Sequence, residues 1–546
     1  MTQQWNLADL FEAVSDAVPD REAVVADRRR ISYRELDERA TRLAHHLAAN
    51  GVQAGDHVGI YAYNGNEWIE AMFGAWKIRA VPINVNYRYV EAELRYLFDN
   101  ADLVALVHGR EFVPRIAAVR ADCPKLTTFV SIDDDTDEDL ATIGAVEYEA
   151  ALAAASPERD FAPRSPDDLY ILYTGGTTGM PKGVMWRQDD YFNSTIGALM
   201  RMGGAPFESF DEVIEEARNA GGMVGFPLAP LMHGAAQWVA TMLLLQGNTL
   251  MLSSARRLDP VATWRTIERE KVMTISLVGD AMARPLIEAL DDPALADIDL
   301  SSFFVVGSGG AILSPTVKEA IASRLPNVLV IDSLGASETG YQGTVTGSDS
   351  TGKPRFAMGE HTTVLDDAGK PVVPGDEVIG RLARRGYMPL GYYKDPEKTA
   401  ATFVEIDGER WALPGDMARV EVDGTITLLG RGSVSINSGG EKIYPEEVEL
   451  ALKSHPDVFD VVVVGVPDER WGERVVAVVK ARPDATPDAG ELAEHARQSI
   501  AGYKVPRAIV VVDEMVRSPS GKADYRWAKA TAVADSAAGS GTTRST

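Results

Sequence analysis

Cysteine is almost absent from this chain of 546 residues, which contains only Cys123. A single thiol can form neither an intrachain disulfide nor a thiolate zinc cage, so disulfide-framework and zinc-finger proteins are excluded. Cys123 lies in the stretch Ala-Asp-Cys-Pro, with no histidine nearby. Reactive thiols need a cationic or basic neighbour. We therefore predict a structural or surface thiol rather than a nucleophile.

Long hydrophobic runs are also missing. The stretch Met242 to Leu245 is typical of the apolar runs that occur, whereas crossing a bilayer takes about 20 apolar residues. The first residues, Met-Thr-Gln-Gln-Trp-Asn, have neither the basic start nor the apolar core of a signal peptide. These features predict a cytoplasmic protein without an integral membrane segment.

Positive charge is scarce, because 54 lysines and arginines face 80 aspartates and glutamates and the net charge is −26. Repulsion by this charge argues against nucleic acid and anionic membranes as partners. It does not exclude a small anionic ligand, since a site creates its own local field. The 45% of hydrophobic and 25% of charged residues are typical of globular proteins. The length allows several domains, each with a sizeable core.

The first hundred residues alternate between helical and strand patterns. Ser32 and Glu35 have the spacing of a capping box, and apolar residues then recur at helical period until Gly51. The predicted elements that follow are a strand at 57–61, a helix at 67–80, a strand at 80–85, a helix at 90–100 and a strand at 103–107. Such alternation predicts parallel strands with crossover helices, which is an α/β fold.

The pattern changes in the last quarter of the chain. Alternating residues around Asp423-Gly424 predict a β-hairpin. After Arg431 a compact unit begins, with a helix from Pro445, strands at 461–466 and 475–481 and a helix at 491–500. We therefore predict an N-terminal domain at 1–430 and a C-terminal domain at 431–529. The Ala/Ser/Gly/Thr-rich residues 530–546 are predicted to be a disordered tail.

Residues 203–222 interrupt the alternation with an acidic, amphipathic helical pattern between glycines. A solvated surface helix is the interpretation that such a pattern favours. A flexible flap beside a binding site is the alternative.

A glycine- and threonine-rich loop follows the short apolar run at 170–173. Glycines let the backbone approach a polyphosphate, hydroxyls add donors, and one lysine neutralises charge. The loop is not a Walker A motif, because Met180 and Pro181 separate the lysine from the last glycine. The predicted phosphate-binding residues are Thr174, Gly175, Gly176, Thr177, Thr178, Gly179 and Lys182.

This loop resembles the signature of adenylate-forming enzymes, which include acyl-CoA synthetases, adenylation domains of peptide synthetases and beetle luciferase. The resemblance runs from about Asn6 to Ala528. In order it includes Met232-His233-Gly234, Gly309-Gly310-Ala311, the residues 334–339, Pro414-Gly415-Asp416, Gly430-Arg431, the residues 440–449 and Gly521-Lys522. The stretches at 184–186, 279–285 and 433–440 look most like actinobacterial acyl-CoA synthetases, particularly those acting on carboxylated sterol side chains.

The resemblance implies a large N-terminal domain of α/β subdomains with a small barrel-like part, and a small mobile C-terminal α/β domain. It also implies an acyl-CoA synthetase. A carboxylic acid attacks ATP to give acyl-AMP and pyrophosphate, and CoA then displaces AMP. The implied ligands are ATP, Mg²⁺, coenzyme A and an apolar carboxylic acid, and the implied assembly is a homodimer.

Three residues match catalytic positions of the family. Lys522 matches a C-terminal lysine that contacts the α-phosphate and the substrate carboxylate. Glu338 matches the glutamate that holds magnesium on the phosphates, with Thr174 as a hydroxyl ligand. His233 matches a histidine that separates the acyl pocket from the nucleotide. Asp416 and Arg431 match residues that bind the ribose hydroxyls. The other nucleotide-binding residues that the resemblance implies are Gly309, Gly310, Ala311 and Ser337.

The chain departs from the family pattern at two positions. Leu334 stands where many members have a tyrosine that stacks on adenine, and Ser433 stands where the hinge between the domains is often Asp or Lys. The expected pocket segments at 233–238, 278–282, 305–310 and 334–341 are small or apolar and carry no obvious internal charge. They favour a medium- or long-chain fatty acid or a steroid side-chain acid.

The residues alone do not decide between this function and several others. The chain could adenylate an acid for another acceptor, such as a carrier protein, or oxygenate it as luciferase does. An aryl-CoA ligase is a further possibility. A non-catalytic sensor is disfavoured, because a sensor has no need of Lys522 and Glu338.

Overall fold

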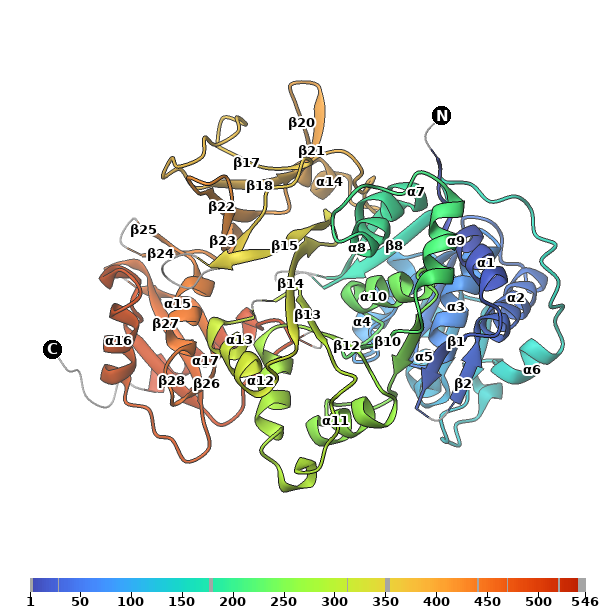
Figure 1. Cartoon of the computed structure of the whole chain (residues 1–546), viewed down its shortest axis with the longest axis horizontal. Coiled ribbons are helices and arrows are strands. Elements are labelled where there is room, and N and C mark those ends of the chain that lie inside the picture. Colours follow the sequence, from blue (N-terminus) through green and yellow to red (C-terminus); the bar gives the residue numbers. More distant parts are fainter. Residues whose placement is uncertain are drawn as a thin grey trace.

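Three β-sheets with helices packed on them make up the chain (Figure 1). The computed structural model describes residues 3–27, 29–175, 180–311, 313–348, 354–438, 441–468, 470–518 and 521–538. Along the horizontal axis of Figure 1, the N-terminal residues lie on the right and the C-terminal unit, in orange and red, lies on the left. The mixed α/β architecture confirms the predicted fold class.

The first sheet has eight strands in the order β19-β9-β8-β4-β3-β5-β6-β7. From β8 to β7 the neighbours are parallel, and β9 and β19 add antiparallel pairs at one edge. Its strands are β3 (His57–Tyr61), β4 (Val81–Asn84), β5 (Leu103–Gly109), β6 (Thr128–Ile132), β7 (Val146–Glu147), β8 (Leu169–Thr174), β9 (Lys182–Arg187) and β19 (Gly391–Tyr392). The predicted strands at 57–61, 80–85 and 103–107 are thereby confirmed.

The second sheet begins with a mostly parallel half, in the order β2-β1-β11-β10-β12-β13-β14. Its strands are β1 (Glu22–Ala26), β2 (Arg29–Ser32), β10 (Val224–Pro227), β11 (Thr249–Leu252), β12 (Thr274–Leu277), β13 (Val305–Gly309) and β14 (Leu329–Ala336). Helices α11 (Pro260–Arg269), α12 (Asp280–Ala289) and α13 (Pro315–Arg324) join these strands and cover a shared apolar core.

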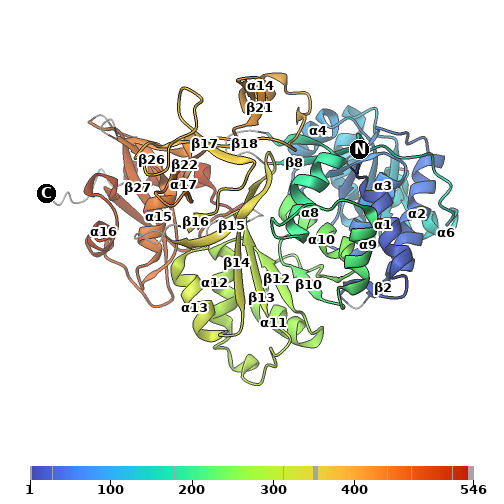
Figure 2. The ribbon, with the colours of Figure 1, turned by 45° about the horizontal axis from the view of Figure 1, so that its top comes forward.

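An antiparallel half continues this sheet where the resemblance implies a barrel-like part. Its strands are β15 (Gly340–Ser348), β16 (Pro354–Phe356), β17 (Thr362–Leu365), β18 (Gly380–Arg384), β20 (Phe403–Ile406), β21 (Glu409–Ala412), β22 (Asp416–Val420) and β23 (Ile426–Arg431). Strands β22 and β23 form the hairpin predicted at Asp423-Gly424. Helix α14 (Pro396–Thr402) precedes β20. Figure 2 shows this part above the parallel half.

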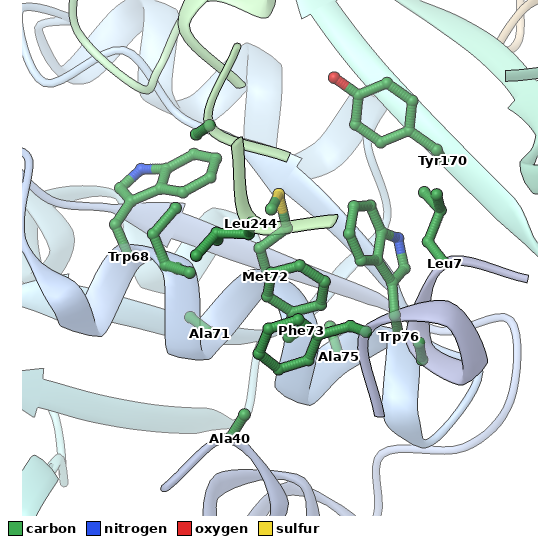
Figure 3. Packing of buried hydrophobic residues seen from close by; sticks show 14 of the residues in the cluster. Leu7, Ala40, Trp68, Ala71, Met72, Phe73, Ala75, Trp76, Tyr170 and Leu244 are labelled. Carbon is green, nitrogen blue, oxygen red and sulfur yellow. The ribbon is translucent and has the colours of Figure 1, made fainter. Parts of the chain in front are cut away.

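The largest apolar core lies between the first two sheets, because it takes side chains from strands of both. Helices α1 (Leu7–Ala17), α2 (Tyr33–Ala49), α3 (Asn66–Lys77) and α10 (Gly234–Leu245) contribute to it. In Figure 3, Trp68, Met72, Phe73 and Trp76 of α3 point into this core beside Leu244 of α10. The other helices of the N-terminal part are α4 (Glu91–Asn100), α5 (Val113–Val119), α6 (Tyr148–Ala153), α7 (Gln188–Tyr191), α8 (Gly197–Met200) and α9 (Phe210–Asn219).

The third sheet belongs to the C-terminal unit, with the order β25-β24-β27-β26 and β28 beside β27. Its strands are β24 (Ile436–Ser438), β25 (Glu441–Ile443), β26 (Val458–Asp468), β27 (Gly472–Ala481) and β28 (Ala508–Val512). Successive residues of a strand point to opposite faces. Val461 and Val463 accordingly pack against α15 (Pro445–Lys453) and α16 (Ala489–Arg497), as the sequence predicts.

The opposite face of this sheet carries a helix where the sequence predicts the start of a disordered tail. Val462 and Val464 pack there against α17 (Tyr525–Ala538), in which Ala528 and Ala532 are fully buried. A disordered tail from residue 530 is therefore wrong for residues 530–538, and residues 539–546 lie outside the described part. The alanine-rich composition resembled low complexity, yet alanines four residues apart let a helix approach a valine-rich face closely.

Two smaller predictions concern α9 and Cys123. Ser209 caps α9 by accepting a hydrogen bond from the Glu212 N–H, and Val213 and Ala217 are buried. The acidic segment is thus a surface helix, as its pattern favours.

Cys123 is buried, and burial raises the pKa of its thiol, which agrees with a structural role. Among the described helices, none is both long and apolar enough to cross a bilayer.

Substituting Phe73 tests the packing of the central core. Its ring is fully buried and stacks on Phe11 with ring centroids 4.0 Å apart. We expect Phe73→Ala to lower the free energy of unfolding by about 3–5 kcal/mol, because it removes apolar contacts and leaves a cavity. Urea denaturation followed by circular dichroism measures the change. Val422→Ala, at a side chain that is 85% exposed, is the control and should stay within about 0.5 kcal/mol.

Candidate active site

The C-terminal lysine meets the N-terminal part of the chain at the ends of several strands. A Cβ built on Gly310, just beyond β13, would lie 3.8 Å from Cε of Lys522. The charges of Glu338, Asp416 and Arg431 all act on the Lys522 ammonium. The structure therefore brings together residues that lie up to 212 positions apart in the sequence. These are the residues that the resemblance assigned to catalysis and to the nucleotide.

The pKa of Lys522 is lowered, first by desolvation and then by repulsion from Arg431, although part of the side chain is exposed. Glu338 and Asp416 oppose this shift. A phosphate anion bound nearby would also oppose it, because an opposite charge favours the charged form of lysine. The surroundings of Lys522 therefore suit an anionic ligand.

Asp416 and Arg431 are neighbours because of the hairpin between β22 and β23. They are register partners at its open end, and the guanidinium Nε lies 3.5 Å from Oδ1 of the carboxylate. The attraction of Asp416 raises the pKa of Arg431, while desolvation raises the pKa of Asp416 itself. A carboxylate acceptor and a guanidinium donor side by side can bind the two hydroxyls of a ribose.

Two aromatic side chains tie the turn that carries Glu338 to the first sheet. The Tyr392 hydroxyl of β19 donates to Oε1 of Glu338 at 2.8 Å, and Nε1 of Trp186 in β9 donates to the Ser337 carbonyl at 3.0 Å. Thr174 lies at the end of β8, opposite Lys182 of β9. Glu338 and Thr174 are thus attached to adjoining strands.

The loop between β8 and β9 is described only at its ends. Gly176, Thr177, Thr178 and Gly179 lie outside the described residues. At one end, the Lys182 ammonium contacts Oδ2 of Asp395 at 2.7 Å and lies 5.8 Å from the centre of the Tyr392 ring. The pKa of Asp395 is lowered by the hydrogen bond from Lys182.

Gly310 faces the Lys522 side chain, and Gly521 faces the segment at Val278 that leads into α12. Both have positive φ angles, +80° for Gly310 and +77° for Gly521, a backbone conformation that favours glycine. A Cβ on Gly521 would lie 3.4 Å from the Val278 carbonyl oxygen. Gly309 ends β13 and pairs with Ser333 of β14. The small residues let the Lys522 backbone approach the strand ends closely, and Ala311 follows in the same turn.

His233 is the N-cap residue of α10, without a capping hydrogen bond from its side chain, and the charges of Lys522 and Arg88 act on it. Desolvation, with repulsion by Lys522 and Arg88, lowers the pKa of its imidazole to about 3. Its buried Nε2 has no hydrogen-bond partner within the described part of the chain. A buried polar atom without a partner is costly, so this nitrogen fits a polar group of a ligand. His233 is neutral at physiological pH.

Two of the four predicted acyl segments, 233–238 and 278–282, contribute to one apolar wall. Val306 and Leu334, from the other two segments, pack in other core clusters. Val278, Trp238, Met282 and Ala311 pack in the same core cluster. Two charges from outside the predicted segments lie near this wall, because Lys522 and Arg88 both act on His233. Arg88 follows β4, and ligand-binding residues gather at the carboxyl ends of parallel strands. That signal could have pointed to Arg88.

Leu334 and Ser433, the two residues that depart from the family pattern, each have a defined place in the fold. Leu334 packs against the apolar core of the antiparallel half, which includes Val364 and Ile426. Ser433 lies in a short 3₁₀ turn, Gly432–Val434, directly after β23. This turn leads into the third sheet.

Comparison with known families decides the class of the protein. Residues 11–393 match the AMP-binding enzyme family, and residues 447–522 match the AMP-binding enzyme C-terminal domain. The chain belongs to the AMP-binding enzyme family. The predicted membership of the adenylate-forming enzymes is thereby confirmed.

Relatives with assigned activities cover nearly the whole chain. A 3-oxocholest-4-en-26-oate--CoA ligase of Rhodococcus rhodochrous is 51% identical over 96% of this chain and 95% of its own length. A medium/long-chain-fatty-acid--CoA/3-oxocholest-4-en-26-oate--CoA ligase of Mycobacterium tuberculosis is 50% identical over 97% of this chain and 96% of its own length. The prediction that the chain is an enzyme of the acid–thiol ligase class agrees with both.

Solved structures confirm the fold. The anthranilate CoA ligase AuaEII in complex with anthranoyl-AMP has a TM-score of 0.84 at 23% identity, covering 98% of this chain and 99% of its own. ATP-bound MatB from Rhodopseudomonas palustris has a TM-score of 0.81 at 25% identity, covering 97% and 99%. The two-part arrangement of this chain is therefore that of known adenylating enzymes.

The site contains few protein donors for a metal ion. No group of three or more His, Cys, Asp or Glu side chains in the described residues could hold a metal. The Glu338 carboxylate and the Thr174 hydroxyl remain as oxygen donors, Glu338 in the turn between β14 and β15 and Thr174 at the end of β8. Magnesium prefers one or two protein oxygens together with substrate phosphates and water, so this sparse donor set fits a magnesium–nucleotide complex.

Glu446 contacts the backbone of the site residue Arg431, and its carboxyl group has a raised pKa. It accepts a hydrogen bond from the Arg431 N–H at 3.4 Å, and Gly430 with φ of +116° leaves room for its carboxyl group. Desolvation raises the pKa of Glu446 to about 8, and Glu449 and Asp416 add to the rise. The carboxyl group is therefore protonated in the folded protein at neutral pH.

Glu446→Gln tests this protonation. A pKa raised in the folded state stabilises the fold at low pH, and that stability is lost as pH rises from the unfolded value of 4.5 through about 8. We expect the variant to match the natural protein near pH 5 and to be more stable than it near pH 9. Thermal unfolding at both pH values measures the difference. A constant difference across this range would contradict the shifted pKa.

Proposed function

We propose that this chain is an AMP-forming acyl-CoA synthetase for an apolar carboxylic acid, either a medium- or long-chain fatty acid or a steroid side-chain acid. The observation that supports this best is the meeting of Lys522 with Glu338, Asp416, Arg431 and His233 at one site. The names of relatives that are about half identical over nearly the full length support the substrate class. The apolar wall around Val278 agrees with such an acid.

The first step joins two anions. The carboxylate of the acid attacks the α-phosphorus of ATP, an acyl–phosphate bond forms, and pyrophosphate leaves. Such a step needs cationic screening and alignment of the reacting groups. Lys522 supplies positive charge that screens the two anions from each other. An attraction over about 4 Å at an effective dielectric near 20 amounts to roughly 4 kcal/mol.

The other residues position the nucleotide. Asp416 and Arg431 bind the ribose hydroxyls, while Gly309, Gly310 and Ala311 form a backbone wall beside the adenine and Ser337 adds a contact. The residues at 174–179 and Lys182 bind the phosphates. Glu338 and Thr174 would hold magnesium together with the phosphates, and the ion would neutralise part of the phosphate charge.

His233 separates the acid from the nucleotide. Its unpartnered Nε2 lies near the Lys522 and Arg88 charges, which together favour a carboxylate at the end of the apolar wall. The neutral imidazole can donate or accept one hydrogen bond there without adding charge.

The second step needs a different arrangement of the two parts. The CoA thiolate attacks the acyl carbon of acyl-AMP, a thioester forms, and AMP leaves. We place the domain boundary at residues 430/431, with the C-terminal domain at 431–529 turning about the Ser433 segment. Conformational changes of this kind often assemble successive catalytic states. Lys522 serves the first step and moves away for the second. A homodimer and a cytoplasmic location stay predictions.

Lys522→Ala tests the assigned charge. We expect the rate of acyl-AMP formation to fall about a thousandfold, because roughly 4 kcal/mol of transition-state stabilisation is removed. Acid-dependent exchange of labelled pyrophosphate into ATP measures this step. Lys529→Ala removes an exposed lysine of α17 that pairs with Glu473 and is the control. Equal activity of the two variants would contradict the role of Lys522.

Gly175→Val tests the phosphate loop. A Cβ at Gly175 meets no other described atom within 4 Å, so the fold should tolerate the change. A bulky side chain should hinder the approach of the backbone to the phosphates, and we expect ATP affinity to fall about tenfold or more. Isothermal titration with ATP and Mg²⁺ measures it, and unchanged affinity would refute the assignment.

A panel of acids tests the substrate class. Acetate, fatty acids of increasing length, aryl acids and steroid side-chain acids are incubated with ATP, Mg²⁺ and CoA, and the products are identified by mass spectrometry. We expect thioesters of fatty or steroid side-chain acids. Pyrophosphate release without a thioester would indicate another acceptor, such as a carrier protein. An aryl thioester as the main product would indicate an aryl-CoA ligase, and no turnover with measurable ATP binding would indicate a sensor.

A further inference from the structure

Backbone pairing closes a turn between Arg517 and Ala523, which carries Lys522 and is described at residues 517–518 and 521–523. Arg517 and Ala523 pair as an isolated antiparallel bridge. Inside it, the Ser518 N–H donates to the Lys522 carbonyl at 2.8 Å, and the Gly521 N–H donates to the Ser518 carbonyl at 2.8 Å. The position of the Lys522 side chain therefore depends on how the base of this turn is fixed.

Arg517 fixes the base of the turn through its guanidinium. Nε and Nη2 donate to Oδ2 and Oδ1 of Asp460, both at 2.6 Å, and Nη1 donates to the Gly521 carbonyl at 3.1 Å. Both side chains are mostly buried, with 15% of Arg517 and 11% of Asp460 exposed. Two parallel hydrogen bonds from one guanidinium to one carboxylate form a fork, which fixes the orientation of the two side chains as well as the distance between them. One guanidinium thus connects β26 to the residue directly before Lys522.

The same cluster reaches the N-terminal part of the chain. The Lys453 ammonium lies 3.8 Å from Oδ1 of Asp460 and 3.7 Å from Oδ2 of Asp280. Asp280 begins α12, which adjoins the C-terminal unit in Figure 1 and Figure 2. The turn itself rests on this segment, because Gly521 faces the Val278 carbonyl. Asp460 therefore joins Arg517 to Lys453, and Lys453 in turn reaches Asp280 of the N-terminal part.

We propose that Arg517 and Asp460 are positioning residues for acyl-AMP formation, which they support by holding the Lys522 turn. The proposal rests on the function proposed above, in which Lys522 acts only in the first step. It predicts a selective defect. Loss of the fork should slow adenylation and spare the transfer of the acyl group from acyl-AMP to CoA.

A purely stabilising role makes a different prediction. Buried ion pairs often contribute little net stability, but removing one partner leaves an uncompensated charge and destabilises the fold. Such a defect lowers the fraction of folded enzyme and reduces both half-reactions equally. The ratio of the two half-reactions therefore separates positioning from stability.

The test uses Arg517→Lys and Asp460→Asn in the full-length enzyme. The first keeps the charge and loses the fork, and the second keeps the shape of the side chain and loses the charge. Pyrophosphate exchange measures adenylation, and conversion of synthetic acyl-AMP with CoA measures thioester formation. We expect adenylation to fall about tenfold to a hundredfold, because misplacing a catalytic group by about 1 Å can cost that much. Thioester formation should stay within about twofold.

Arg482→Lys is the matched control. Arg482 of the C-terminal unit pairs with Glu288 of α12 at 2.5 Å, so it also joins the two parts, but this ion pair does not include the Lys522 turn. The same arginine-to-lysine change there should leave the ratio of the half-reactions within about twofold of the natural enzyme.

Two results would overturn the proposal. One is an equal decrease of both half-reactions in Arg517→Lys and Asp460→Asn, and the other is unchanged adenylation in both. Lys522→Ala in the same assays keeps the function separate: if that variant adenylates normally, the proposed role of Lys522 fails. If Lys522→Ala is inactive in adenylation and the fork variants are not selective, only the positioning role fails.

Discussion

The attraction between a few cations and the anions of the reaction is the constraint on which the rest of the site depends. The protein carries a net charge of −26, so it must create a positive field locally to bring a carboxylate to a polyphosphate. Lys522 and Arg88 both repel a positive charge on His233, while Glu338 and Asp416 partly balance Lys522 and Arg431. Such a field is stronger where water is partly excluded, as it is at Asp416, whose side chain is 17% exposed.

The scaffold holds these charges with ordinary pairing and packing. The register of β22 and β23 alone places Asp416 beside Arg431. Hydrogen bonds from Tyr392 and Trp186 attach the Glu338 turn to strands of the first sheet. Preorganised groups of this kind do not have to rearrange during the reaction, which is how such sites lower a barrier. Lys522 differs, because it belongs to the C-terminal unit and reaches the site from there.

Much of this organisation could be predicted locally. The strand at 57–61 coincides with β3, and the helix predicted at 90–100 coincides with α4 to within a residue, because hydrophobic periodicity and caps act over short distances. Motifs that occur in the family's order, together with the resemblance, predicted the site residues Glu338, Asp416 and Lys522. The helix at 530–538 was missed because composition says nothing about the valine-rich face on which Ala532 packs.

The sequence by itself determined the alternating α/β pattern, the hairpin at Asp423-Gly424 and the family. Only the tertiary structure decided that Arg88 lies near His233, and that Arg517 holds the turn of Lys522 through Asp460, 57 positions earlier. The physical reason is the range of the interactions. Caps, turns and periodic faces depend on neighbours a few residues away, whereas a charge or a hydrogen bond between distant segments exists only after the sheets have packed.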